Sequence, residues 1–323
     1  MLKKIKRNTF ALVHYLSICF LWTGLCFHGN AQTIETPPPL SEEGKIGKGK
    51  PDESVITVKA EDIEHARKKG EEVKAYVGKA IDEIKSFIRS LEQDAKAMAL
   101  YRDRLRQEKK YYQNKEVNQK FLELLDREIE VVKEKIDIDN EQIETYEDRI
   151  AVLHDQTKVY SDLVVLLTLI AKLEEEISTT PYDTTPMIQK EVDIAKNYIA
   201  EIQDGIKEKE SVVSFFTNRL KEIRDKTFVD EQNLAQDLKS VKEGIGNDEL
   251  SGKLQEKIES ILLLKKAVNE QWVTIFKTRL ETSRIRYDIA LQAWKNAELN
   301  AAFLAEKARH LEEKQKEGKL KNR

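Results

Sequence analysis

The sequence predicts an all-α protein, an elongated antiparallel coiled coil or helical bundle of about four long helices in two hairpins, with no β-sheet. Charged residues make up 35% of the 323 residues, while glycine and proline number only 12 and 6. Apolar residues recur in alternating steps of three and four, the spacing that keeps one stripe of a helix against a partner helix. No stretch of useful length alternates with a period of two, so we expect no strand.

The longest apolar seam runs from Leu122 to Leu167, and only Asp139 and Thr157 interrupt it. Its members are Leu122, Leu125, Ile129, Val132, Ile136, Asp139, Ile143, Tyr146, Ile150, Leu153, Thr157, Tyr160, Val164 and Leu167. At 1.5 Å per residue, a helix of this length is about 70 Å long. We therefore expect the rest of the chain to be organised around this helix.

A first seam, from Ile63 to Leu105, precedes it in a different heptad phase. The two seams are separated by residues 106–120, where only Tyr111, Tyr112 and Val117 are apolar. We predict that residues 57–177 form a long helical hairpin with its tip near Gln113–Asn114. The alternative is one uninterrupted helix with a register shift.

A connector follows at residues 178–186, with the sequence STTPYDTTP. Thr185 followed by Pro186 is typical of a helix start, with a capping side chain and a proline in the first turn. We predict a second long hairpin over residues 187–311, which turns at Gly244–Asp248, and a charged tail at residues 312–323 that frays. The sequence leaves open whether the two hairpins pack together or splay.

Residues 1–31 have the features of a signal peptide. Lys3, Lys4, Lys6 and Arg7 precede an apolar run at residues 10–27, and Gly29–Ala31 offers a cleavage site. We expect a periplasmic or secreted protein. The alternative is an uncleaved membrane anchor formed by residues 10–27, a run of about the minimum length that spans a bilayer.

Residues 32–56 form a flexible linker rich in proline and glycine. Both cysteines, Cys19 and Cys26, lie in the predicted signal peptide, so a mature chain has no disulfide and no cysteine nucleophile. Cleavage after Ala31 removes four positive charges and leaves 51 basic against 58 acidic residues, a net charge of −7. A mildly acidic chain gives no reason to expect nucleic acid as a partner.

Signals for catalysis, cofactors or metals are weak. Residues 44–50 fit part of a phosphate-binding loop, but Pro51 stands where such a loop needs serine or threonine. Asp137, Asp139 and Glu141 resemble the start of a calcium loop, yet Gln142 occupies the position of the required glycine. We expect no enzymatic activity, no cofactor and no metal site.

Two apolar features exceed what a two-helix seam needs. Residues 163–171 are apolar nearly all round, so we expect them to be buried on several sides. The last helix carries two apolar faces, and the second includes aromatic residues that are favoured as anchors of interfaces. This face either packs inside the chain or binds a partner or a second copy. The predicted partner-binding residues are Trp272, Phe276, Leu280, Tyr287, Leu291 and Trp294.

The sequence therefore favours an exported, non-enzymatic coiled-coil protein that acts as a structural spacer, scaffold or adaptor in a bacterial-type cell envelope. One alternative is a periplasmic, chaperone-like protein that binds clients through its apolar faces. Another is an accessory helical region of a membrane channel or transport assembly. In composition and heptads the chain is similar to the helical periplasmic regions that precede the membrane part of some large mechanosensitive channels. Membrane contact is expected only if the N-terminal segment stays uncleaved.

Overall fold

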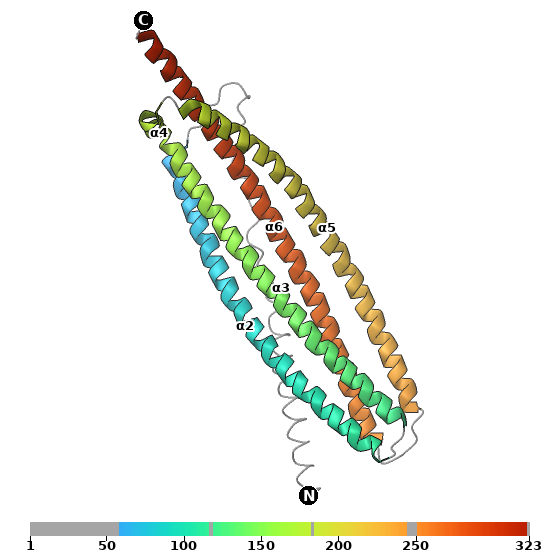
Figure 1. The fold of residues 1–323 in the computed structure, drawn as a ribbon. Helices are drawn as coiled ribbons and strands as arrows, with labels where there is room; N and C mark the ends of the chain where they lie inside the picture. Colours follow the sequence, from blue (N-terminus) through green and yellow to red (C-terminus); the bar gives the residue numbers. More distant parts are fainter. Residues whose placement is uncertain (1–57, 116–118, 182–183, 244–250, 322–323) are drawn as a thin grey trace. The chain divides into compact units, whose positions relative to one another are not determined.

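Helices account for nearly all of the chain that the computed structural model describes, which is residues 58–115, 119–181, 184–243 and 251–321. All of these residues belong to one unit, residues 46–323. Within the described residues there are five helices and no strand, as Figure 1 shows. The helices are α2 (Ala60–Gln113), α3 (Gln119–Ala171), α4 (Leu173–Thr179), α5 (Thr185–Glu243) and α6 (Ser251–Lys321). The predicted all-α bundle is confirmed.

The four long helices that were predicted are α2, α3, α5 and α6, and the structure adds one short helix, α4, that was not predicted. The backbone of Lys172 leaves the helical conformation, with φ −100° and ψ 13°, and separates the seven-residue α4 from α3. The apolar periodicity continues through Leu173 and Ile177, both buried. Periodicity alone therefore could not reveal the break.

The first predicted hairpin is present. Helix α2 ends at Gln113, α3 begins at Gln119, and the two helices pack along each other. The alternative of one uninterrupted helix is therefore wrong. All fourteen members of the Leu122–Leu167 seam are buried or half-buried.

Helices α5 and α6 form the second hairpin and pack along each other in the same way. Helix α5 begins at Thr185, directly before Pro186, where the sequence predicted a helix start. The predicted turn at residues 244–248 lies outside the described residues. Helix α6 continues to Lys321, so the charged segment that was expected to fray is helical as far as that residue.

The two hairpins pack together through α3 and α6, which lie between α2 and α5 in Figure 1. Lys265 bonds Glu134, Arg149 bonds Glu281 and Arg286 bonds Asp148, at sequence separations of 131, 132 and 138 residues. A nearly constant separation means that α3 and α6 run parallel. Helix α6 packs against α3, α4 and α5, and helix α3 packs against α2, α4 and α6, so these two helices are the inner pair of the bundle.

Apolar side chains that join both hairpins gather near the two ends of the α3–α6 contact. The first group, which we call the tip cluster, combines residues of α2, α3, α5 and α6, among them Leu105, Leu125, Leu238, Ile261 and Leu264. The second group, the α4-end cluster, comprises Leu166, Ile170, Leu173, Ile177, Ile188, Phe303, Ala308 and Leu311. Between these ends, the cluster around Ile84 and Leu153 joins mainly α2 to α3.

The apolar run at residues 163–171 is not buried all round. Leu166, Leu167 and Ile170 face the core, but Val165 is 60% exposed and Leu169 is 39% exposed. The expectation of burial on several sides is wrong for these two residues, because no described helix covers that side of α3.

The predicted signal peptide (1–31), the possible anchor (10–27) and the linker (32–56) with its phosphate-loop-like motif lie outside the described residues. Among the helices that are described, none combines the length and the apolar character that a bilayer crossing requires.

Candidate functional site

The six predicted partner-binding residues lie on the middle of α6, and the structure divides them into two groups. Phe276 and Leu280 are buried, with exposures of 8% and 7%. The ring of Phe276 lies 6.4 Å from that of Phe216 on α5, which means that the chain's own packing covers it. For these two residues, packing inside the chain is the correct alternative. A partner surface stays a prediction for the half-buried residues Trp272, Tyr287, Leu291 and Trp294.

An aromatic cluster links α6 to both of its long neighbours. The rings of Trp272 and Phe276 are 6.1 Å apart, and the guanidinium of Arg279 lies 5.6 Å from the centre of the Phe276 ring. Arg279 also forms an ion pair with Glu141 of α3. Contacts between a cation and an aromatic face are favourable. Together these side chains connect α3, through α6, to Phe216 of α5.

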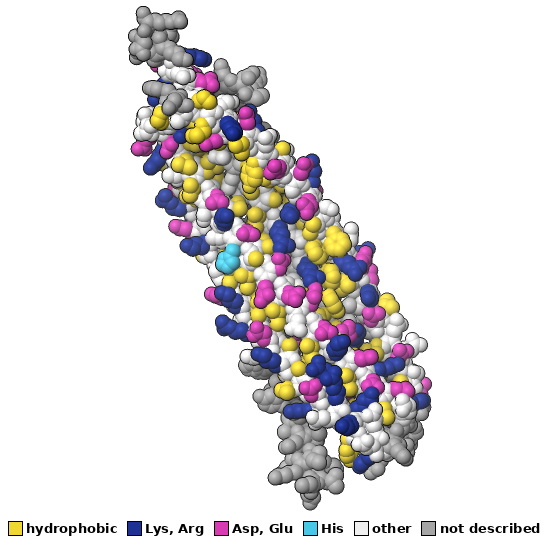
Figure 2. All heavy atoms as spheres, in the orientation of Figure 1, with side chains coloured by type: hydrophobic (Ala, Val, Ile, Leu, Met, Phe, Trp, Pro, Cys, Tyr) yellow, Lys and Arg dark blue, Asp and Glu magenta, His cyan; other side chains and the backbone are white. Residues whose placement is uncertain are grey.

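Helix α5 carries exposed apolar side chains that the sequence analysis did not single out. They are Met187, Ile194, Tyr198, Phe215, Phe228 and Val229, with exposures between 51% and 63%. Met187, Ile194, Phe215 and Val229 share one heptad position, and we call these four residues the outer stripe of α5. In Figure 2, hydrophobic side chains emerge among charged ones along the face that carries α3 and α5.

The outer stripe had a sequence signal, but a weak one. The same heptad position contains Glu201, Glu208 and Glu222 between the apolar members. Because these three carboxylates interrupt the series, the apolar members do not form a continuous seam in the sequence.

The most unexpected feature is a second heptad position of α3 that is polar and yet buried. Its members are Glu128, Lys135, Gln142, Arg149 and Gln156, all between 0% and 8% exposed. Long polar residues are rarely buried unless they are paired. Their sequence pattern is that of a solvated face, which is why they were missed. Glu128, Gln142 and Arg149 have partners on α2 or α6, whereas Lys135 pairs with Asp139 of α3 itself.

Glu128 is the centre of a network that joins three helices. Its carboxylate accepts a hydrogen bond from the hydroxyl of Tyr101 on α2 at 2.5 Å and pairs with Lys257 of α6 at 3.0 Å. Lys257 also pairs with Glu108 of α2 at 3.0 Å. Burial, followed by the Glu128 charge, raises the pKa of Tyr101. Burial alone would lower the pKa of Lys257, but the two carboxylates outweigh it and raise that pKa.

The polar break at Asp139 has a specific set of partners. Its Oδ1 accepts hydrogen bonds from Lys135 at 2.6 Å and from Gln271 of α6 at 2.7 Å. Gln271 also donates to Gln142 at 3.1 Å. A polar residue within an apolar seam can fix the register of the helices at some cost in stability, and the bond of Asp139 to Gln271 across the helices is suited to that task. Burial raises the pKa of nearby Asp94; the charge of Lys135 partly offsets this effect, and that of Asp139 adds to it.

Farther along, Arg149 pairs with Glu281 of α6 at 2.7 Å. At the edge of the same interface, three acidic residues of α3 in successive heptads bind basic residues of α6. These pairs are Glu134 with Lys265, Glu141 with Arg279 and Asp148 with Arg286. Charge pairing at heptad edges selects partner and orientation. The α3–α6 contact is therefore aligned by charge as well as by apolar packing.

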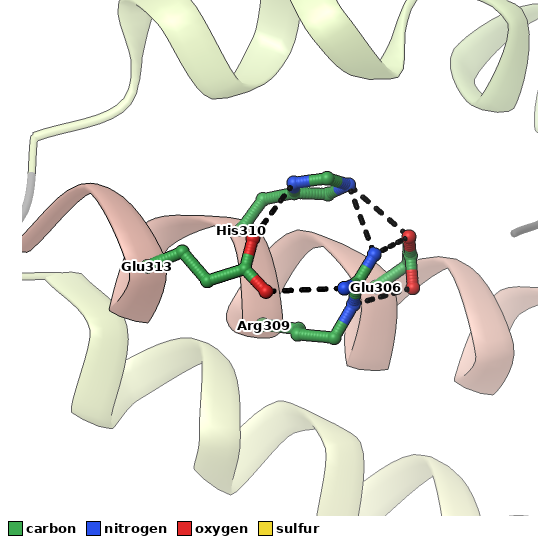
Figure 3. Close-up of polar contacts among 4 residues, drawn as sticks. All are labelled: Glu306, Arg309, His310 and Glu313. Carbon is green, nitrogen blue, oxygen red and sulfur yellow. Dashed lines mark hydrogen bonds and ion pairs between the residues drawn. The ribbon is translucent and has the colours of Figure 1, made fainter. Parts of the chain in front are cut away.

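The three histidines of the described chain do not approach one another. His65 and His154 are exposed, and His310 lies in a surface cluster on α6 with Glu306, Arg309 and Glu313, shown in Figure 3. The hydrogen bond from Arg309, the largest effect, and the nearby charges of Arg309 and His310 lower the pKa of Glu306. Because all four residues belong to one helix, their contacts support α6 locally.

The His, Cys, Asp and Glu side chains of the described residues form no group of three or more that could hold a metal ion. Asp137, Asp139 and Glu141 lie within α3, where Asp139 bonds Lys135 and Glu141 bonds Arg279. Both carboxylates thus bind basic side chains of the protein, an arrangement suited to holding helices in register.

Comparison of the chain with models of known protein families, with curated proteins and with solved structures found no match.

The buried tyrosine Tyr160 gives a pH prediction. Burial, followed by the charge of Asp288, raises the pKa of Tyr160 to about 12, against roughly 10 for an unfolded tyrosine. The folded state therefore favours the neutral form of Tyr160. The contribution of this tyrosine to the free energy of unfolding is complete below pH 10 and is lost between about pH 10 and 12. In a spectrophotometric titration, Tyr160→Phe should remove one late-ionising tyrosine. An unchanged late phase would contradict this assignment.

Proposed function

We propose that the chain is an exported, non-enzymatic scaffold or adaptor of a bacterial-type cell envelope. The main observation in support is that paired charges hold α3 and α6 in parallel register over most of their contact. Helix α6 has 71 residues, which corresponds to a length of about 105 Å. Helices of this length, fixed against one another, suit a spacer that sets a distance between two attached components. The expected signal peptide supports a location outside the cytoplasm.

We propose that the outer stripe of α5 docks the partner. Large apolar side chains at one heptad position of an exposed helix form a seam that a second helix can cover. Tryptophan, tyrosine and arginine dominate many interfaces energetically, and the half-buried Trp272, Tyr287, Leu291 and Trp294 of α6 stay candidate contact residues. A protein partner or a second copy of the chain is thus the expected occupant.

The docking proposal is tested by photo-crosslinking in cells. A crosslinking amino acid at Phe215, 59% exposed on α5, is expected to capture one defined protein or a second copy. The matched control is Leu100, which is 63% exposed on α2 and lies outside the outer stripe. The double variant Ile194→Ser/Phe215→Ser should abolish the crosslinked complex without changing the melting temperature. Equal crosslinking at both positions, or none at Phe215, would contradict an adaptor role for α5.

Export has its own test. Cell fractionation should place the chain outside the cytoplasm, and sequencing of its N-terminus should begin after Ala31. An intact N-terminus in a membrane fraction would favour the anchored form, whereas a cytoplasmic location would refute the envelope role.

A client-binding function is the second candidate, favoured by the six exposed apolar side chains on α5. Exposed apolar surface is a common feature of protein-binding sites. A client binder should suppress the aggregation of several unrelated unfolded proteins, measured by light scattering. An adaptor should suppress none of them.

A further inference from the structure

We propose that the bundle is most compliant in its middle, where α3 and α6 open locally before either end does. We define the polar middle as residues 142–156 of α3 and residues 278–296 of α6. This inference concerns the isolated chain and does not depend on a scaffold role. It follows from the polar composition of the core in this segment.

Polar side chains fill much of the interior of the polar middle. They are Gln142, Thr145, Arg149 and Gln156 on α3, and Thr278, Thr282, Ser283 and Gln292 on α6, all between 1% and 8% exposed. The α3–α6 contact is flanked by the apolar tip cluster on one side and the α4-end cluster on the other. Burial of apolar surface is the main force that holds helices together, so this force is weaker in the middle.

Several of these polar groups form hydrogen bonds that do not connect helices. Thr145 donates to the carbonyl of Glu141, Thr282 to that of Thr278 and Ser283 to that of Arg279, each at 2.8 Å within its own helix. Such bonds satisfy the hydroxyl groups but survive when the helices separate. These residues occupy core volume without adding cohesion between α3 and α6.

Other buried polar atoms in the same segment have no hydrogen-bond partner. They are Nε of Arg149, Oε1 of Gln156 and Nε1 of Trp294. A buried polar atom without a partner carries a desolvation cost that water would relieve on opening. Local opening of the polar middle therefore recovers solvation that the closed state lacks.

The apolar contacts in the polar middle lie mainly within the first hairpin, between α2 and α3. Val77, Ala80, Ile81, Ile84, Val152 and Leu153 join α2 to α3, and Ile285 is the buried residue that α6 adds to them. The cross-helix bonds are mainly ion pairs, such as Arg149 with Glu281 and Arg286 with Asp148. Charges regain hydration when they separate, so ion pairs oppose opening less than apolar burial does.

Hydrogen exchange followed by mass spectrometry on the full chain tests the proposal. Regions that open at low free-energy cost exchange faster than a stable core. Amides of residues 142–156 and 278–296 are expected to exchange about tenfold faster than those of residues 121–132 and 254–264. The triple variant Thr145→Val/Thr282→Val/Ser283→Ala should reduce this ratio, because it adds apolar surface to the α3–α6 core.

The matched control is Thr217→Val on the exposed side of α5, where the hydroxyl makes the same type of bond to the carbonyl of Val213 at 2.8 Å. This variant should leave the ratio unchanged. If the triple variant fails to fold, Gln156→Leu alone serves the same comparison. Equal protection of the middle and the ends in the unmodified chain would overturn the proposal. A failed crosslink at Phe215 would leave this result untouched.

Discussion

Leu264→Ala is expected to lower the free energy of unfolding by about 2–5 kcal/mol, the usual cost of removing a buried leucine side chain. Leu264 is 3% exposed and belongs to the tip cluster, which joins both hairpins. Loss of its side chain removes apolar contacts and leaves a cavity at a point where four helices meet. The change should appear in urea unfolding monitored by circular dichroism.

The neighbouring Leu263→Ala is the matched control, because Leu263 is 59% exposed on the same helix. Surface substitutions usually change stability by less than about 0.5 kcal/mol. Similar losses for the two variants would mean that this face of α6 is not the face that packs into the bundle.

Arg149→Met is expected to cost about 3 kcal/mol or more, since the removal of one partner leaves a charge uncompensated inside the protein. Arg149 is 4% exposed and its partner Glu281 is 18% exposed at the α3–α6 contact. Replacement of both partners, Arg149→Met/Glu281→Leu, should recover most of the lost stability, because an apolar pair of similar volume often replaces a buried ion pair without loss. Thermal and urea unfolding of the single and double variants provide the measurement.

The surface pair Arg219 and Glu222 on α5 provides the comparison, with side-chain exposures of 48% and 61%. Arg219→Met should change stability by no more than about 1 kcal/mol. If Arg149→Met were equally mild, the Arg149–Glu281 pair would be hydrated and would contribute little to holding α3 and α6 together.

Much of the fold could be predicted from local patterns. The phase difference between the Ile63–Leu105 and Leu122–Leu167 seams indicated a hairpin, and α2 ends at Gln113, where the tip was expected. The pair Thr185–Pro186 marked the start of α5. These signals are local, because helix starts, breaks and seams depend on neighbouring residues along one helix.

The candidate site was predicted less completely. The aromatic face of α6 was recognised, but Phe276 and Leu280 proved to be covered inside the chain. The outer stripe of α5 was missed because Glu201, Glu208 and Glu222 interrupt its apolar series. Exposure depends on which neighbours a helix has, and the heptad pattern of one helix does not name them.

By itself the sequence determined that the chain folds into long paired helices, because a 3.5-residue apolar period can bury its surface only against another helix. The tertiary structure decided that the two hairpins pack together and that α3 and α6 run parallel as the inner pair of helices. It also showed that Glu128, Lys135, Gln142, Arg149 and Gln156 are buried. The cross-helix partners of Glu128, Gln142 and Arg149 on α6 lie 129 to 132 residues away in sequence. Only the packing of the second hairpin on the first brings such groups together. Polar residues whose sequence pattern resembles a solvated face therefore align the helices inside the core.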